Sequence, residues 1–155
     1  IESFNKKSTL SLKDFFISYR KTKLKKGQFI SSIRIPIYKK NIFKAYKISK
    51  RIDDDISSVC ASFNLAIVNK KIKNIKIAYG GMAPTPKRAI HCEKILLNSD
   101  FSEKIILKAQ ICLEKDFQPI DDMRASKNYR MAIAKNLLLK CFAEIKNNKS
   151  IRLNH

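Results

Sequence analysis

The residues best suited to chemistry lie in one short stretch that begins at Lys47. The basic side chains of Lys47, Lys50 and Arg51 are followed by three consecutive aspartates, residues 53–55. Carboxylates on consecutive residues of an extended chain point in alternating directions, so at most two of them can face the same ligand. This argues against a Ca²⁺ site, which needs about six to eight oxygen ligands. From the residues alone, the stretch is either a solvated turn or a functional site.

The cysteines, histidines and glycines are not spaced as in any known type of metal or phosphate site. The cysteines are far apart, with no CxxC pair and no histidine at metal-ligand spacing, so we expect buried apolar side chains rather than an iron–sulfur or zinc site. The glycines form no phosphate-binding pattern. We expect His91 on the surface and no role for the terminal His155. The cysteines and glycines are Cys60, Cys92, Cys112, Cys141, Gly27, Gly80 and Gly81.

Composition limits the class of protein. The chain has 155 residues, is 45% hydrophobic and carries a formal net charge of +20. Its lysines are spread along the chain and its arginines are few, which argues against a nucleic-acid interface, where basic residues cluster on one face. No apolar run approaches the roughly 20 residues that cross a bilayer, and the first residues show no signal pattern. We therefore expect a soluble, cytoplasmic protein with one hydrophobic core.

Hydrophobic periodicity predicts strands first and helices last. Alternation of apolar and polar residues predicts strands over 29–35, 43–49, 56–68 and around 75–79. Apolar residues at helical spacing predict helices over 86–97, 102–115 and 125–146. Because the strands are consecutive and joined by short links, we expect an antiparallel sheet. The predicted fold is α+β, with a sheet of three to four strands covered by three helices in a two-layer sandwich.

Several local signals refine these elements. Thr85 followed by Pro86 is typical of a helix start, and Ser102 is a second capping residue. An apolar cluster around residues 15–19 predicts a short amphipathic turn or helix. Five further residues are expected to have structural roles rather than to take part in chemistry. They serve packing, helix capping or a tight exit from a strand: Gly80, Gly81, Met123, Arg124 and Tyr129.

Five segments of the chain resemble one known family. They are FFISYRKT (15–22), ISSIRIP (30–36), FKAYKISKRIDDDI (43–56), KIAYGGMAPTPKRA (76–89) and DDMRASKNYRMAIAKNLLLK (121–140). In this order and spacing they resemble the FAD domain of the molybdenum hydroxylases, in particular the flavin and iron–sulfur subunit of xanthine dehydrogenases. The resemblance covers about residues 10–145. It implies three parts: the end of the FAD-binding domain with a connecting strand (1–42), a domain like the CO dehydrogenase flavoprotein C-terminal domain (43–147), and a tail (148–155).

The resemblance implies roles for the basic and acidic stretch. The lysine that matches Lys47 contacts FAD in this family, and the acidic loop that matches 53–55 lies beside the isoalloxazine ring. Asp54 aligns with the flavin-edge aspartate, and Arg51 is its nearest counter-charge in the sequence. Ile30 matches a branched aliphatic residue that packs on the flavin, with ordinary core packing as the alternative.

The resemblance also implies a function that extends beyond this chain. A molybdopterin centre elsewhere oxidises a purine, 2Fe-2S clusters carry the electrons to FAD, and the reduced flavin passes them to NAD. The implied partners are an N-terminal FAD and iron–sulfur portion and a molybdenum-binding large subunit. We therefore expect a fragment or split-gene product that is inactive alone.

Two alternatives to this function stay open. CO dehydrogenase, aldehyde and quinoline oxidoreductases share the domain, so the substrate and the electron acceptor could differ. The other alternative is a non-catalytic basic module that binds RNA or an acidic protein.

Overall fold

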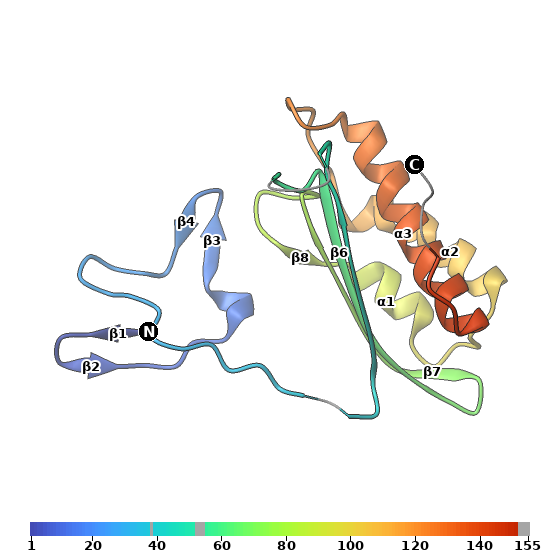
Figure 1. Cartoon of the computed structure of the whole chain (residues 1–155), viewed down its shortest axis with the longest axis horizontal. Coiled ribbons are helices and arrows are strands. Elements are labelled where there is room, and N and C mark those ends of the chain that lie inside the picture. The colour runs from blue at the N-terminus through green and yellow to red at the C-terminus, as the bar shows by residue number, and fades with distance from the viewer. Residues whose placement is uncertain (38, 52–54, 152–155) are drawn as a thin grey trace. The chain divides into compact units, whose positions relative to one another are not determined.

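The computed structural model describes residues 1–37, 39–51 and 55–151 (Figure 1). Contacts between residues divide the chain into two units, Ile1–Lys39 and Lys40–His155. Each unit is described below by itself.

A four-stranded antiparallel sheet forms one layer of the larger unit. Its strands are β5 (Ile42–Ile48), β6 (Val59–Val68), β7 (Lys71–Gly80) and β8 (Lys87–Arg88), which lie in that order across the sheet. The link between β6 and β7 is the two-residue turn Asn69–Lys70, and both residues have positive φ, 50° and 61°. Two consecutive residues of this conformation form the tight hairpin turn whose twist matches the strands.

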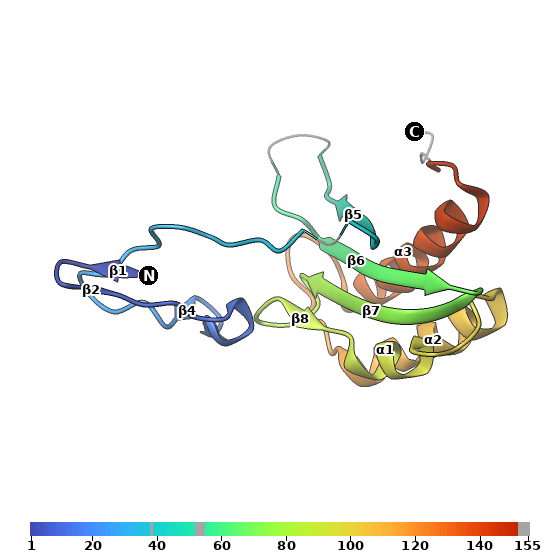
Figure 2. The same cartoon turned by 90° about the horizontal axis from the view of Figure 1, so that it is seen from below.

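Three helices form the second layer. They are α1 (Ile90–Leu96), α2 (Glu103–Asp116) and α3 (Lys127–Asn147), and all three lie on the same side of the sheet (Figures 1 and 2). The predicted α+β sandwich is confirmed. Among the described residues, no helix is both long and apolar enough to cross a membrane.

The alternation of apolar and polar side chains in β6 and β7 decides which face of the sheet the helices cover. Every second residue from Val59 to Leu65 in β6 and from Ile75 to Tyr79 in β7 is at most 7% exposed, and these side chains belong to one core cluster with the apolar stripes of α2 and α3. A register shift after Ala66 changes the alternation near the hairpin, as a β-bulge does. Burying one large apolar side chain contributes about 1.5–3 kcal/mol, so packing of this face against the helices stabilises the fold strongly. The buried strand residues are Val59, Ala61, Phe63, Leu65, Ile72, Ile75, Ile77 and Tyr79.

The opposite face of the sheet carries mainly small and polar side chains, and we call it the open face. None of the three helices lies on this side (Figure 1). Cys60 lies between Val59 and Ala61, which point towards the helices, so Cys60 is exposed on the open face. The expectation that all cysteines are buried is therefore wrong for Cys60. The residues of the open face include Ala45, Lys47, Cys60, Ser62, Ala78 and Gly80.

The smaller unit contains two short hairpins. β1 (Glu2–Ser3) pairs with β2 (Lys6–Lys7), and β3 (Phe16–Ser18) pairs with β4 (Lys21–Thr22). The helical turn predicted around 15–19 is wrong, because Arg20 adopts a positive φ of 57° and reverses the chain so that β3 finds a partner. A 3₁₀ turn occurs earlier, at Leu12–Asp14.

The strand predicted over 29–35 is also absent from the described structure. Only Phe29 forms a bridge, exchanging backbone hydrogen bonds of 2.9 and 3.0 Å with Glu2. Ile33 and Ile35 are 74% and 77% exposed. Alternation predicts the two faces of a strand, but a strand also needs a neighbour for its backbone groups, and within the described residues nothing pairs with 30–35.

The first helix starts later than predicted. Lys87 and Arg88 follow Pro86 as β8, which pairs with the end of β7, and α1 begins only at Ile90. The carboxylate of Asp116 accepts hydrogen bonds from the N–H groups of His91 at 2.9 Å and Cys92 at 3.0 Å. Asp116 thus provides the cap expected from Thr85, because tertiary packing brings the end of α2 to the start of α1.

The buried carboxylate of Glu144 joins the C-terminal end of α3 to β5. Its side chain is 3% exposed, and Oε2 lies 3.2 Å from Lys44 Nζ and accepts a hydrogen bond from Tyr46 Oη at 2.9 Å. Oε1 accepts from Lys140 Nζ at 2.7 Å and from the N–H of Ile151 at 3.1 Å. Burial alone would raise the pKa of Glu144, but these contacts outweigh it and lower the pKa to about 2.

We expect Glu144→Gln to lower the free energy of unfolding at neutral pH by about 1.5–3 kcal/mol, the range for hydrogen bonds to a charged group. The pKa in the folded state lies below the ordinary 4.5. The contribution of the carboxylate is therefore complete above about pH 5 and is lost as the pH falls towards the folded pKa.

Urea denaturation at a series of pH values measures this effect. The difference between the two proteins should shrink as the medium is acidified, and a difference independent of pH would contradict the assignment. Glu114→Gln is the control: Glu114 pairs with Lys135 but is 59% exposed, so its loss should change stability little.

Candidate functional site at the loop between β5 and β6

The loop of residues 49–58 carries most of the charged residues that the sequence singles out. It leaves the sheet after Ile48 and returns at Val59, and its base is closed by a 2.7 Å hydrogen bond from the N–H of Ser58 to the carbonyl of Ile48. The structure describes residues 49–51 and 55–58 of this loop. Asp54, the predicted flavin-edge residue, lies outside the described residues.

Lys47 stands beside the loop on the open face of the sheet. It is the second-last residue of β5 and is exposed. Its partner on β6 is Cys60, and the partner of Cys60 on β7 is Gly80. The next row of the sheet carries Ala45, Ser62 and Ala78. Lys47 is therefore a cation at the edge of a patch of small side chains.

Arg51 pairs with Asp55 across the described part of the loop. The distance from Arg51 Nε to Asp55 Oδ2 is 3.7 Å, and Asp55 Oδ1 accepts a hydrogen bond of 2.8 Å from the N–H of Ile56. Desolvation raises the pKa of Asp55, but the hydrogen bonds from Ile56 and Arg51 and the charge of Arg51 outweigh it, so the pKa is lowered. Asp55 is thus held as a carboxylate beside the arginine.

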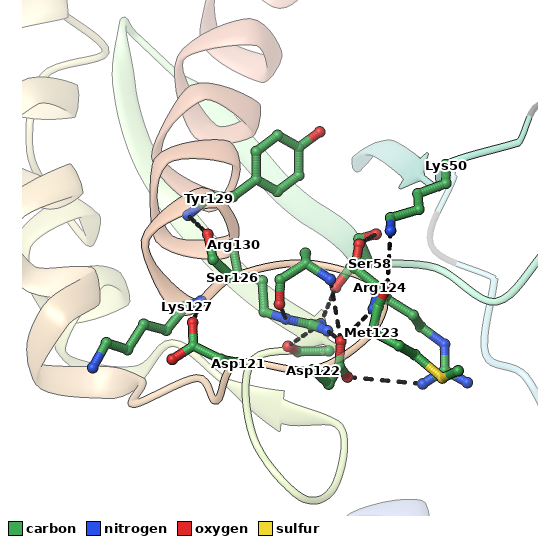
Figure 3. Close-up of polar contacts among 12 residues, drawn as sticks. Lys50, Ser58, Asp121, Asp122, Met123, Arg124, Ser126, Lys127, Tyr129 and Arg130 are labelled. Carbon is green, nitrogen blue, oxygen red and sulfur yellow. Dashed lines mark hydrogen bonds and ion pairs between the residues drawn. The ribbon is translucent and has the colours of Figure 1, made fainter.

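Arg130, in the first turn of α3, holds the loop from the helix side (Figure 3). Its side chain is 3% exposed. Nη1 donates to the carbonyls of Ser58 and Gly81, and the bond to Gly81 is 2.9 Å long. Nη2 donates to Asp122 Oδ1 at 2.6 Å, and Nε donates to the carbonyl of Ala125 at 3.4 Å. One guanidinium therefore joins the loop, the end of β7 and the segment before α3.

The segment before α3 is itself fixed by carboxylates. Asp122 Oδ1 accepts the N–H groups of Arg124 at 2.8 Å and Ala125 at 3.1 Å. Desolvation raises the pKa of Asp122, but these N–H groups and the guanidinium of Arg130 outweigh it and hold the pKa below its usual range. Asp121 accepts the N–H of Lys127 at 2.7 Å, which places a second negative charge at the N-terminal end of the helix.

Two further contacts tie the loop to this segment. Lys50 Nζ donates to the carbonyl of Met123 at 2.8 Å, and Ser58 Oγ donates to the carbonyl of Arg124 at 3.3 Å. Figure 3 shows Lys50 and Ser58 next to Met123 and Arg124. Both described arms of the loop are therefore attached to the same hydrogen-bonded segment before α3.

Gly81 is required where β7 ends. Its φ is +79°, and a Cβ placed on it would lie 2.3 Å from the carbonyl oxygen of Ser58 and 3.1 Å from Arg130 Nη1. Any other residue would therefore push the loop away from the helix. The strand exit predicted at this glycine thus makes room for the contact between the loop and Arg130.

Sequence reasoning missed Arg130, although a signal was present. Arg130, Ala134, Leu137, Leu138 and Cys141 follow one another at the spacing of a buried helical stripe, and all are buried. A charged residue at such a position needs polar partners in the interior. That requirement could have marked Arg130 as the centre of a polar network.

Ile30 belongs to the unit Ile1–Lys39, whereas Lys47 and Arg51 belong to Lys40–His155. Ile30 is 47% exposed and lies outside the named strands. Among the described residues, no group of three or more histidine, cysteine or acidic side chains could hold a metal ion.

We expect Gly81→Ala to lower the free energy of unfolding by about 2 kcal/mol or more, because the methyl group combines an unfavourable φ with a backbone clash. Gly80→Ala is the matched control. Its Cβ would lie 3.7 Å from Cys60 Cβ, an ordinary contact. Urea denaturation of both variants checks this, and equal stability of the two would show that the Gly81 position is not restricted.

Comparison with known proteins gives relatives among oxidoreductases. Over 119 residues the chain is 34% identical to a xanthine dehydrogenase of Emericella nidulans, an alignment that covers 74% of this chain and 9% of that protein. Over 136 residues it is 31% identical to the glyceraldehyde dehydrogenase medium chain of Sulfolobus acidocaldarius, covering 85% of this chain and 47% of that protein. The chain thus spans less than half the length of either relative.

The fold matches that of a solved carbon monoxide dehydrogenase from Hydrogenophaga pseudoflava, with a TM-score of 0.75 over 81% of this chain and 44% of that chain. The sequence identity is 22%, so this likeness concerns the fold alone. The family model of the CO dehydrogenase flavoprotein C-terminal domain matches residues 44–145, a range that includes the loop, Gly81 and Arg130. The resemblance to molybdenum hydroxylases is confirmed, and the chain belongs to the CO dehydrogenase flavoprotein C-terminal domain family.

Proposed function

We propose that this chain is the C-terminal part of the FAD domain of a xanthine dehydrogenase-type molybdenum hydroxylase. In the complete enzyme, electrons from purine oxidation at a molybdopterin centre pass through 2Fe-2S clusters and FAD to NAD. The partners are an N-terminal portion that shares the FAD and carries the clusters, and a molybdenum-binding large subunit. The observation that carries the proposal is the loop 49–58, held by Arg130 next to Lys47 within the region that matches the family.

The residues around Lys47 fit a flat ring system that gains negative charge on reduction. The row Ala45, Ser62 and Ala78 consists of small side chains on the open face, and these leave room for a ring system. Lys47 adds a positive charge at the edge of this patch. FAD, when bound, accepts electrons as pairs or singly and passes them on. Lys47 and Ile30 are the residues of this chain that we assign to FAD binding.

The charges of this chain would set how readily the bound flavin is reduced. A cation near the ring stabilises the negative charge that develops on reduction, and we assign this role to Lys47. An aspartate near the ring does the opposite, and we assign this role to Asp54. Arg51 partly offsets the negative charge of the acidic loop, since its guanidinium lies 3.7 Å from the carboxylate of Asp55.

A second candidate keeps the family but changes the substrate. The Sulfolobus relative is named as a glyceraldehyde dehydrogenase chain and shares 31% identity, close to the 34% of the xanthine dehydrogenase. Sequence identity at this level does not show whether the substrate is an aldehyde or a purine, because this chain would contact the flavin and not the substrate. Under the proposal, the molybdenum-binding partner decides which substrate is oxidised.

We expect the 155-residue chain alone to bind no FAD, because the pyrophosphate of FAD needs a glycine-rich loop and the chain has only three glycines. Absorbance near the flavin bands after purification and desalting measures this. Mixing with an N-terminal FAD-binding half should restore one flavin per complex. Stoichiometric flavin on the chain alone would contradict the proposed division of the site.

In the subunit reassembled with an N-terminal half, we expect Lys47→Ala to weaken FAD retention and to lower the flavin potential. Asp54→Asn should raise the potential. Each shift should be on the order of 30 mV, which for a two-electron couple corresponds to about 1.4 kcal/mol. Redox titration measures both values.

Lys76→Ala is the control for these variants, because Lys76 is exposed and lies on the same face of the sheet, opposite Asn64. It should leave the potential and the flavin content unchanged. Unchanged potentials and normal flavin content in both the Lys47 and Asp54 variants would instead identify residues 47–55 as a solvated turn.

A further inference from the structure

Arg130 acts on the part of the sheet that carries Lys47. Lys47 pairs with Cys60 across β5 and β6. Arg130 Nη1 donates to the carbonyl of Ser58, two residues before Cys60, and to the carbonyl of Gly81, directly after β7. A single side chain from α3 therefore fixes two chain segments beside the proposed flavin contact.

The contacts of Arg130 use the shape of the guanidinium. Its three nitrogens reach four acceptors: the carbonyls of Ser58, Gly81 and Ala125, and the carboxylate of Asp122. A planar group with several fixed donors can serve acceptors that lie in different directions, whereas a lysine ammonium is a single compact charge. The position therefore selects arginine for geometry as well as for charge.

Stability alone gives little reason for a buried arginine at this position. The side chain of Arg130 is 3% exposed, whereas that of its partner Asp122 is 30% exposed, and an ion pair with a partner open to water contributes little to stability. Replacing buried charged groups by apolar residues of similar volume is often neutral or stabilising. Arg130 continues the apolar stripe of Ala134 and Leu137, where a leucine or methionine would extend the core. What an apolar residue could not do is hold the carbonyls of Ser58 and Gly81 in place.

We propose that Arg130 is a positioning residue, which holds the Ser58 arm of the loop, and through it the adjoining end of β5 that carries Lys47, in the arrangement that sets the flavin potential. Asp122 orients the guanidinium and Gly81 leaves room for it. The proposal rests on the proposed function, and it adds that the charges near the flavin are placed from the N-terminal end of α3.

The first test uses the 155-residue chain without flavin. The N–H of Ser58 donates to Ile48 at the base of the loop, so its hydrogen exchange reports opening of the loop. We expect Arg130→Lys to speed exchange of the Ser58 amide by about tenfold or more, because the ammonium replaces only part of the network. Asp122→Asn, which keeps an oxygen for the N–H groups of Arg124 and Ala125, should give a smaller increase.

The second test measures the flavin potential in the subunit reassembled with an N-terminal half. Arg130→Lys should shift the potential, and Asp122→Asn should shift it in the same direction by less. Glu144→Gln is the matched control, because Glu144 is a buried charge at the opposite end of the same helix. Its polar partners among the described residues are Lys44, Tyr46, Lys140 and Ile151, which lie outside the loop. It should lower stability without changing the exchange of the Ser58 amide or the potential.

Each outcome decides the proposal. Ser58 exchange that rises no more in Arg130→Lys than in Glu144→Gln would overturn it, because Arg130 would then act only through stability. Faster exchange with an unchanged potential would overturn the link between the loop and the flavin. In that case Lys47→Ala separates the two explanations: if it also leaves the potential unchanged, the proposed function itself fails.

Discussion

Burial of only one face of the sheet is the constraint on which the rest of the structure depends. The alternation in β6 and β7 directs Val59, Phe63, Ile77 and Tyr79 towards the helices, where each is at most 1% exposed. Because successive side chains point to opposite faces, the same alternation directs Lys47 and Cys60 to the open face. The core and the proposed flavin contact are therefore two consequences of one register.

Two buried charged groups attach α3 to the sheet at its two ends. Glu144 binds Tyr46 and Lys44 of β5 near the C-terminal end, and Arg130 binds the carbonyls of Ser58 and Gly81 near the N-terminal end. Apolar packing along the helix is compatible with small sliding movements, whereas directional hydrogen bonds are not. These polar contacts thus fix the position of α3 along the sheet, and the Arg130 contacts transmit that position to the loop.

The arrangement suits a domain that completes a cofactor site formed with another part of the protein. A rigid helical layer supports the loop from one side, and small residues on the open face leave space on the other. Membership of the CO dehydrogenase flavoprotein C-terminal domain family agrees with such a role. The chain spans 9% of the length of its xanthine dehydrogenase relative. Under the proposed function, the chemistry of substrate oxidation belongs to the molybdenum-binding partner.

The sequence by itself determined the elements whose residues carry their own signal. The strand pattern of 56–68 became β6, and the helical spacing in 102–115 and 125–146 became α2 and α3 with small shifts at the ends. Local periodicity is sufficient here because each pattern identifies one apolar face, and a core is available to cover it. The family resemblance likewise rests on residues that are adjacent in the chain.

Only the tertiary structure decided the features that depend on a distant partner. The alternating residues 30–35 do not form a strand within the described structure, because no strand there pairs with them. Helix α1 begins at Ile90 rather than after Thr85, because Asp116 arrives from α2 to cap it. The role of Arg130 was hidden for the same reason: its partners Ser58 and Gly81 lie 72 and 49 residues away in sequence. A local pattern can say that a charge is buried, but only the packed chain shows which carbonyls it holds.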